Sequence, residues 1–475
     1  MSDASDSARV PWAEVLTRAQ APSLVLVCLG VWLHAADALI VATMLPAVVR
    51  DLGGAAYVSW SVALYELGSI VAGTVSALWV LRWGVHRAMV GAALVFALGC
   101  IVSAVAPGMP VLLVGRLLQG LGGGGLSALA FIGVARLFSP RLMARVMALI
   151  SILWGASAFL GPLIGGLFVT YATWRTGFLF FAAQACALAC LILFGIGFPG
   201  NAQAGPAPRR APLGRLALLA AGTLLVASAG VSVSWRRTPA LLGLGFAAIS
   251  AFLWLDRRHA ETRLLPRHAF GLGTPAGAAL LMNLLLSMAT IGLATYGPIL
   301  MTVIHHIPAI TAGYVLAAEA IGWSLTAVAL SGAPETQDTR HILGGMVVVT
   351  LGVGGMIWAI PHGPVGLIAA FATLQGAGFG SAWTFVLRRA RRLVAPDDLE
   401  RLSGAMSSVG HFGYGLGAAL TGIVANAAGF SERAGADEAR HVALAVYGFC
   451  LPMAILGLGA TVRFVRPAQP STLAR

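Results

Sequence analysis

Three acidic side chains interrupt long apolar stretches of the chain: Asp37, Glu66 and Glu319. An ionised carboxylate is costly in hydrocarbon, so each must face a water-filled cavity, pair with a cation or carry a proton. Burial favours the protonated form of a carboxyl group, whereas a nearby cation favours the ionised form. A carboxyl that alternates between these environments exchanges a proton for a cation. The three acids are therefore candidate proton- and substrate-coupling groups.

One arginine, Arg116, lies in the glycine-rich apolar stretch Leu112–Gly125. Its guanidinium is permanently charged and needs a partner or a wet cavity. Asp37 and Glu66 are expected about 3–4 Å to the outer side of the midplane and Arg116 about 9 Å to that side. Long side chains can close this gap, so either acid could contact Arg116 and be tuned by it. The alternative is a purely structural Asp37–Arg116 pair that only fixes helix packing.

Other polar side chains in apolar stretches have two interpretations each. His34 lies three residues before Asp37, so it could share that helix face and relay protons, or it could simply be hydrogen-bonded inside a bundle. His411 has the same two interpretations. The polar groups that could bind substrate or equally join helices are Gln119, Asn283 and Gln375.

The composition indicates a polytopic membrane protein. Of 475 residues, 58% are hydrophobic and 10% are charged, against about 25% charged in soluble domains. The 30 basic residues give a net charge of +13, but their placement argues against nucleic-acid binding. Apart from Arg116, nearly all lie on one side of the predicted spans, as the positive-inside rule requires. The exceptions are Arg50, Arg175, Arg236, Arg237, Arg433 and Arg440.

Apolar runs of about 18 residues or more predict membrane-spanning helices. We expect fourteen, which places both termini in the cytoplasm. They are 23–46, 57–80, 88–107, 111–135, 143–170, 176–198, 216–234, 239–255, 275–303, 310–332, 342–361, 365–387, 402–427 and 441–463.

An internal repeat divides these spans into two all-α halves. The sequence LQGxGxG around Gln119 recurs around Gln375, 256 residues later, and Glu66 and Glu319 lie 253 residues apart at similar places in their halves. We therefore expect Glu319 to be the pseudo-symmetric equivalent of Glu66. The predicted divisions are a tail 1–22, a six-helix bundle 23–199, a linker and inserted two-helix hairpin 200–273, a six-helix bundle 274–464 and a tail 465–475.

Several motifs together resemble the major facilitator superfamily, in particular its fourteen-span drug:proton antiporter branch. Span 1 has D-x-x-I-V-x-x-x-L-P from Asp37 to Pro46, and span 4 has R-x-x-Q-G-x-G from Arg116 to Gly122. Span 5 has LGPLIGG, which is similar to the antiporter motif and includes Gly161, Pro162, Gly165 and Gly166. The resemblance implies two bundles around a central cavity and alternating access. Packing alone explains the span 5 residues, and flexing there is a further hypothesis.

The loop between spans 2 and 3 departs from the family pattern. It keeps Arg82, Gly84 and Arg87, which the resemblance makes gating residues, but Leu81 replaces the usual acid. In span 13, Gly410 and His411 replace a common Arg-Gln pair. The chain is therefore expected to be a divergent member.

The favoured function is proton-coupled efflux of lipophilic, cationic compounds by a monomer in a bacterial inner membrane. The alternatives are proton-coupled uptake or exchange of a small metabolite, such as an organic anion held by Arg116, and a non-transporting receptor or scaffold. The partners are a small molecule, protons and the bilayer. No P-loop, HExxH or nucleophile motif is present, and the five cysteines form no CxxC or Cys/His cluster, so we expect no enzyme, cofactor or metal.

Overall fold

The computed structural model describes residues 14, 17–18, 20–194, 212–259, 262–266, 268–394, 396–431 and 433–466. Most of the predicted N-terminal tail, the linker residues 200–211 and residues 467–475 lie outside this range. The described helices are α2 (Ala21–Leu52), α3 (Val58–Ala104), α4 (Met109–Leu137), α5 (Pro140–Tyr171), α6 (Trp174–Phe194), α7 (Leu213–Val231), α8 (Arg237–Arg258), α9 (Pro275–His305), α10 (Ala309–Leu330), α11 (Asp338–His362), α12 (Val365–Leu393), α13 (Pro396–Ala427) and α14 (Ala436–Val465), with short 3-10 turns η1 (Ala55–Tyr57) and η2 (Glu335–Gln337).

These helices provide the fourteen predicted spans, because α3 contains two of them. Gly84 interrupts α3 with φ 77° and ψ 164°, in the region that favours glycine. Thirteen segments in the described chain are long and apolar enough to cross a membrane. The fourteenth is α13, whose sequence begins with Pro-Asp-Asp-Leu-Glu-Arg and continues with many glycine and serine residues. The all-helical membrane fold is confirmed, with thirteen to fourteen candidate membrane spans in the described chain.

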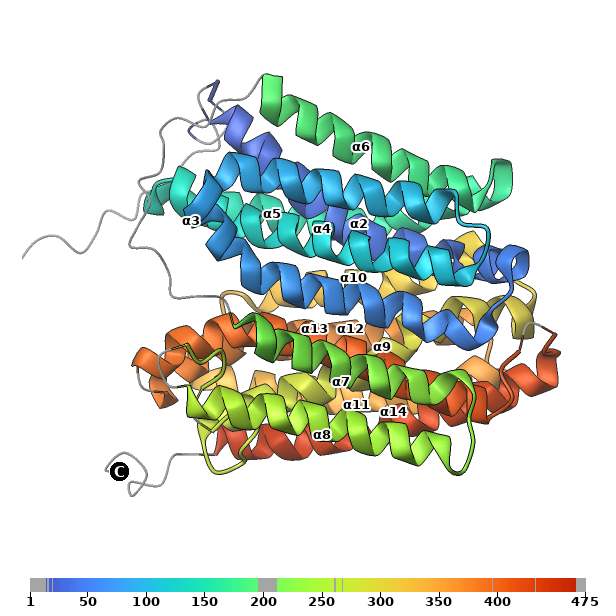
Figure 1. Cartoon of the computed structure of the whole chain (residues 1–475). Helices are drawn as coiled ribbons and strands as arrows, with labels where there is room; N and C mark the ends of the chain where they lie inside the picture. The colour runs from blue at the N-terminus through green and yellow to red at the C-terminus, as the bar shows by residue number, and fades with distance from the viewer. Residues whose placement is uncertain are drawn as a thin grey trace, which may run out of the picture.

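The helices form two groups that lie side by side (Figure 1). Helices α2 to α6 pack mainly among themselves, with α3 against α4 as the most extensive pair. In the other group α11 and α10 pack on α12, and α9 packs on α13 and α14. The inserted hairpin, α7 and α8, packs through α7 on α13 and less extensively on α3. The architecture is two six-helix bundles with an added hairpin, as predicted.

Matching glycine contacts confirm the internal repeat and correct one equivalence. A Cβ on Gly120 would overlap the carbonyl oxygen of Tyr65, and a Cβ on Gly376 would overlap that of Glu319. Gly120 and Gly376 are equivalent in the repeat, so Glu319 corresponds to Tyr65. The expectation that it corresponds to Glu66 is wrong by one residue, which on a helix is a rotation of about 100°.

The two halves contact each other closely at the end away from the chain termini. Gly166 of α5 lies against Ile310 of α10, and Gly313 of α10 lies against Pro162 of α5. Gly161 and Gly165 instead let α5 approach α2: their Cβ positions would lie 2.9 Å from Leu39 Cβ and 3.1 Å from the Ile40 carbonyl oxygen, respectively. The glycines of the span 5 motif therefore have a packing role in this structure.

A cavity lies toward the other end of the helices. Gly73 of α3 and Gly404 of α13 line one cavity, and a Cβ added to either would meet no atom within 4 Å. A second cavity, of about 730 Å³, lies at the opposite end of the helices, where Arg50 of α2, Thr170 of α5 and Val303 of α9 line it.

Replacing Gly120 tests the close α3–α4 contact. We expect Gly120→Ala to destabilise the protein by about 1–3 kcal/mol, because the methyl group forces the two backbones apart. Gly91→Ala is the matched control, since a Cβ there meets nothing within 4 Å. Thermal unfolding in detergent measures the difference, and equal midpoints for the two variants would contradict the packing argument.

Candidate functional site

Arg116 on α4 is buried inside the N-terminal half, where several groups contact its guanidinium. Its Nη1 donates to Asp37 Oδ2 at 2.6 Å and to Gln119 Oε1 at 2.5 Å, and Nε donates to the Ser61 carbonyl oxygen at 3.4 Å. The guanidinium also lies over the ring of Tyr65, 4.4 Å from its centroid. These contacts supply the compensation that a buried cation needs. The predicted Asp37–Arg116 contact is therefore present.

Asp37 is sealed from the space between the halves. Its exposed fraction is 0%, that of Arg116 is 2%, and among the described residues Asp37 Oδ1 has no hydrogen-bond partner. In this arrangement a substrate cannot reach the carboxylate without movement of the surrounding helices. This geometry fits the alternative interpretation of Asp37 and Arg116, a structural ion pair that fixes helix packing.

Tyr65 and His34 extend the polar cluster from Arg116 toward the second half. The Tyr65 hydroxyl lies 2.8 Å from His34 Nδ1 and donates to the His34 carbonyl oxygen at 3.2 Å. Both side chains are buried, and the two rings stack with centroids 5.7 Å apart. Tyr65 was not singled out by sequence reasoning, although its place beside Glu66 in an apolar helix was the available signal.

Glu66 pairs across the interface between the halves. Its Oε2 lies 2.6 Å from His411 Nδ1 on α13, and the side chains are 13% and 29% exposed. The expected alternative, a contact between Glu66 and Arg116, is not formed, because Arg116 is held by Asp37 and Glu66 faces α13. The His411 ring lies 5.9 Å from the His34 ring, so the cluster continues from one half to the other.

Glu319 lies in the C-terminal half, where its hydrogen-bond partner is the side-chain amide of Gln375. Gln375 Nε2 donates to its Oε1 at 2.7 Å. Ala372 occupies the place that Arg116 has in the first half, so Glu319 lacks the buried cation that holds Asp37. The side chain is partly exposed.

Of the remaining predicted residues, Asn283 and Gln119 contact neighbouring helices, and Arg82 and Arg87 lie at the surface. Asn283 donates to the Met406 carbonyl oxygen at 2.7 Å and so links α9 to α13, and Gln119 links Arg116 to Cys100 Sγ at 3.3 Å. Arg82 and Arg87 are exposed on either side of the Gly84 break. No group of three or more potential metal ligands occurs in the described part of the chain.

A double-mutant cycle tests how far Arg116 depends on Asp37. We expect Asp37→Leu or Arg116→Leu alone to destabilise the protein by about 3–5 kcal/mol, because each leaves an uncompensated buried charge. The double variant should recover part of that loss.

The matched control is the exposed pair Arg175–Asp51, whose side chains are 38% and 49% exposed. The same cycle there should give a coupling of about 0–1 kcal/mol. Unfolding midpoints measure both cycles, and additive effects at Asp37 and Arg116 would show that the buried contact contributes no coupling.

Comparison with known proteins agrees with this architecture. The model of the Major Facilitator Superfamily matches residues 27–334. A probable multidrug-efflux transporter of Mycobacterium tuberculosis is 31% identical over 436 residues, which is 90% of this chain and 92% of the relative. A multidrug resistance protein B homolog of the same species is 28% identical over 396 residues, covering 79% of this chain and 71% of the relative.

Solved structures support the fold. An inward-facing, unoccupied bacterial homolog of the human lysosomal transporter Spinster has a TM-score of 0.67 at 14% identity, over 94% of this chain and 98% of that chain. The inward-open xylose transporter XylE of E. coli has a TM-score of 0.61 at 14% identity, over 95% and 97%. The chain is a multi-pass membrane protein that belongs to the Major Facilitator Superfamily.

Proposed function

We propose that the protein exports lipophilic cations in exchange for protons, by alternating access between its two halves. The family membership and a relative named for multidrug efflux support the transport class. The polar cluster between the halves supports proton coupling. It contains acids and histidines, which can take up and release protons, rather than a nucleotide-binding motif.

The Glu66–His411 pair is the observation that carries this proposal. It joins α3 of one half to α13 of the other, at 2.6 Å, and its side chains retain some exposure. A proton on Glu66 or a cationic substrate beside it would each replace the histidine as the partner of the carboxylate. Separation of the halves at this point must break the pair, so occupancy of Glu66 and the conformational state are linked.

The other acids have different proposed roles. Asp37 and Arg116 are buried deeper in the N-terminal half than Glu66, and the Arg116 guanidinium packs on the Tyr65 ring. The Tyr65 hydroxyl in turn contacts His34, whose ring lies near His411. We assign Asp37 and Arg116 to tuning this cluster. Glu319, with Gln375 as its partner, is a second proton or cation group on the C-terminal side.

The geometry gives less support to anion transport. Arg116 is the cation on which such a substrate would depend, yet it is 2% exposed and already engaged by Asp37 and Gln119. A membrane scaffold without transport remains distinguishable by experiment, because it gives no proton-driven flux.

Glu66→Gln tests the coupling directly. In proteoliposomes, we expect this variant to lose proton release on addition of a cationic dye, because the amide cannot exchange a proton. Binding of the dye should weaken about tenfold or more, as loss of a charge-assisted contact implies. His411→Gln should retain dye binding but alter the pH dependence of exchange.

Glu335→Gln is the matched acid control, since Glu335 is 66% exposed and pairs with Arg392 in a loop region away from this cluster. Wild-type behaviour of Glu66→Gln would reject the assignment of Glu66. Absence of proton-driven dye flux in the wild-type protein under every gradient would instead favour the scaffold.

We also propose that both termini are cytoplasmic in the plasma membrane of a bacterium, from the placement of the arginines. In a cysteine-free background of intact cells, Ser234→Cys between α7 and α8 should react with an impermeant maleimide. Ser139→Cys between α4 and α5 should react only after permeabilisation. Both serines are exposed at helix ends. The reverse labelling pattern would invert the orientation and the direction of transport.

A further inference from the structure

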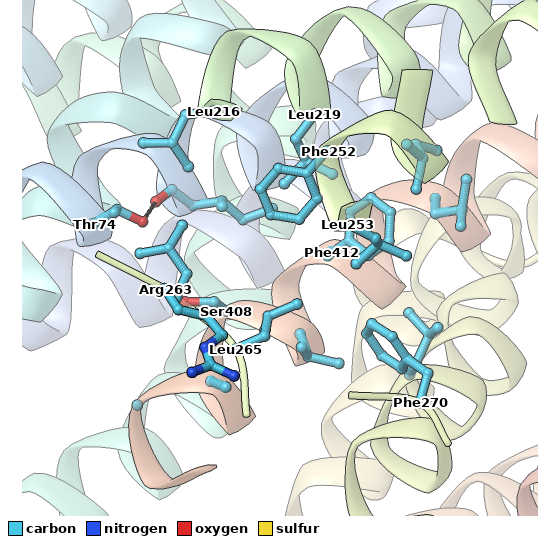
Figure 2. A pocket seen from close by; sticks show the side chains of 18 of the residues that line it. Thr74, Leu216, Leu219, Phe252, Leu253, Arg263, Leu265, Phe270, Ser408 and Phe412 are labelled. Carbon is cyan, nitrogen blue, oxygen red and sulfur yellow. Dashed lines mark hydrogen bonds between the residues drawn. The ribbon is translucent and has the colours of Figure 1, made fainter. Parts of the chain in front are cut away.

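A cavity of about 620 Å³ lies beside the inserted hairpin, between it and the helices α3, α9 and α13. Figure 2 shows Leu216, Phe252 and Leu253 of the hairpin on one side and Phe412 of α13 near them. The volume is in the range of small-molecule sites, about 300–1,000 Å³. Because Gly73 and Gly404 contribute no side chains to the wall, α3 and α13 leave the space unfilled.

The lining combines an apolar body with a positive edge. Most of the described lining residues are aliphatic or phenylalanine, and the charged ones are Arg263 and Arg401. No carboxylate is among the described lining residues. In Figure 2 the Arg263 guanidinium lies at one border of the cavity, near Leu265 and Ser408, away from Phe252.

The backbone on both sides of Arg263 is held by the Arg215–Asp256 ion pair of the hairpin. Arg215 Nη1 donates to Asp256 Oδ1 at 2.6 Å, and Arg215 Nη2 donates to the Thr262 carbonyl oxygen at 2.7 Å. On the other side of Arg263, the backbone N–H groups of Leu264 and Leu265 donate to the Asp256 carboxylate at 3.1–3.2 Å. The segment around Arg263 is therefore fixed to both α7 and α8.

Arg263 nevertheless has an unused donor. Its Nε is buried and has no hydrogen-bond partner within the described part of the chain. A buried unpaired donor on a cation is costly, and it points to a ligand that would accept the hydrogen bond. An anionic acceptor suits the Arg263 guanidinium, and an apolar remainder of the ligand suits the cavity.

We propose that this cavity binds an anionic phospholipid of the leaflet on the side of the chain termini. Its phosphate accepts hydrogen bonds from Arg263, and part of an acyl chain occupies the apolar space between the hairpin, α3 and α13. Basic pockets between membrane helices on the cytoplasmic side recognise such head groups. The hairpin thereby forms one wall of a lipid site between the two halves.

Native mass spectrometry of the delipidated full-length protein tests the proposal. Wild type should bind phosphatidylglycerol about tenfold more tightly than phosphatidylcholine. Arg263→Gln should lower the affinity for phosphatidylglycerol about tenfold, to that for phosphatidylcholine, through loss of a charge-assisted contact. The matched control is Arg257→Gln, which removes an exposed charge from the same hairpin. This variant should leave the affinities for both lipids unchanged.

The apolar part of the site has its own variant. Gly73→Phe should fill the cavity and lower the affinity for both lipids, whereas Gly459→Phe, another helical glycine with open space around its Cβ, should not. Unfolding midpoints confirm that the variants fold.

Three outcomes would overturn the lipid assignment. Equal affinity for the two lipids, unchanged by Arg263→Gln, would show that the cavity is apolar and has no site for an anionic head group. Displacement of phosphatidylglycerol by inorganic phosphate alone would indicate a free-anion site. Displacement by a transported cationic dye would indicate a substrate chamber. Proton release that depends on Glu66 is measured separately, so failure of the lipid site leaves the proposed function intact.

Discussion

The hydrocarbon core of a bilayer offers no water to a charged side chain, so a charge buried among the helices needs a partner or must be neutralised by a proton. Two solutions are visible. Arg116 and Asp37 satisfy each other inside the N-terminal half, where both are almost fully buried. Glu66 finds its partner, His411, only on the opposite half. The first pair belongs to one half, and the second exists only when the halves are close.

The internal repeat conserves backbone packing and not polar chemistry. Equivalent glycines, Gly120 and Gly376, bring equivalent helices together in both halves. The first half places a tyrosine and a buried ion pair at this crossing, whereas the second places Glu319 beside an amide. A common scaffold thus carries two different polar sites, and an asymmetric exchange cycle can be built on a nearly symmetric fold.

Apolar run lengths and glycine patterns predicted the membrane-spanning helices well, because hydropathy and helix geometry are properties of local sequence. The Asp37–Arg116 contact also followed from predicted depth. The partner of Glu66 did not, since it lies 345 residues away and depends on how two helices are rotated. One residue of register also misplaced Glu319, because neighbouring positions on a helix face directions about 100° apart. Contacts between the halves can be assigned only once the positions and rotations of the helices in the tertiary structure are known.

The hairpin changes which parts of the molecule can move together. Helix α7 packs closely on α13, where Gly230 meets Ile423, and only lightly on α3. In the proposed alternating-access cycle, the hairpin would therefore move with the second half, as eight helices against six, although the internal repeat relates six helices to six. In such a cycle the two bodies would have unequal cross-sections and would displace unequal areas of lipid, so bilayer thickness and tension would bias the balance between its conformations.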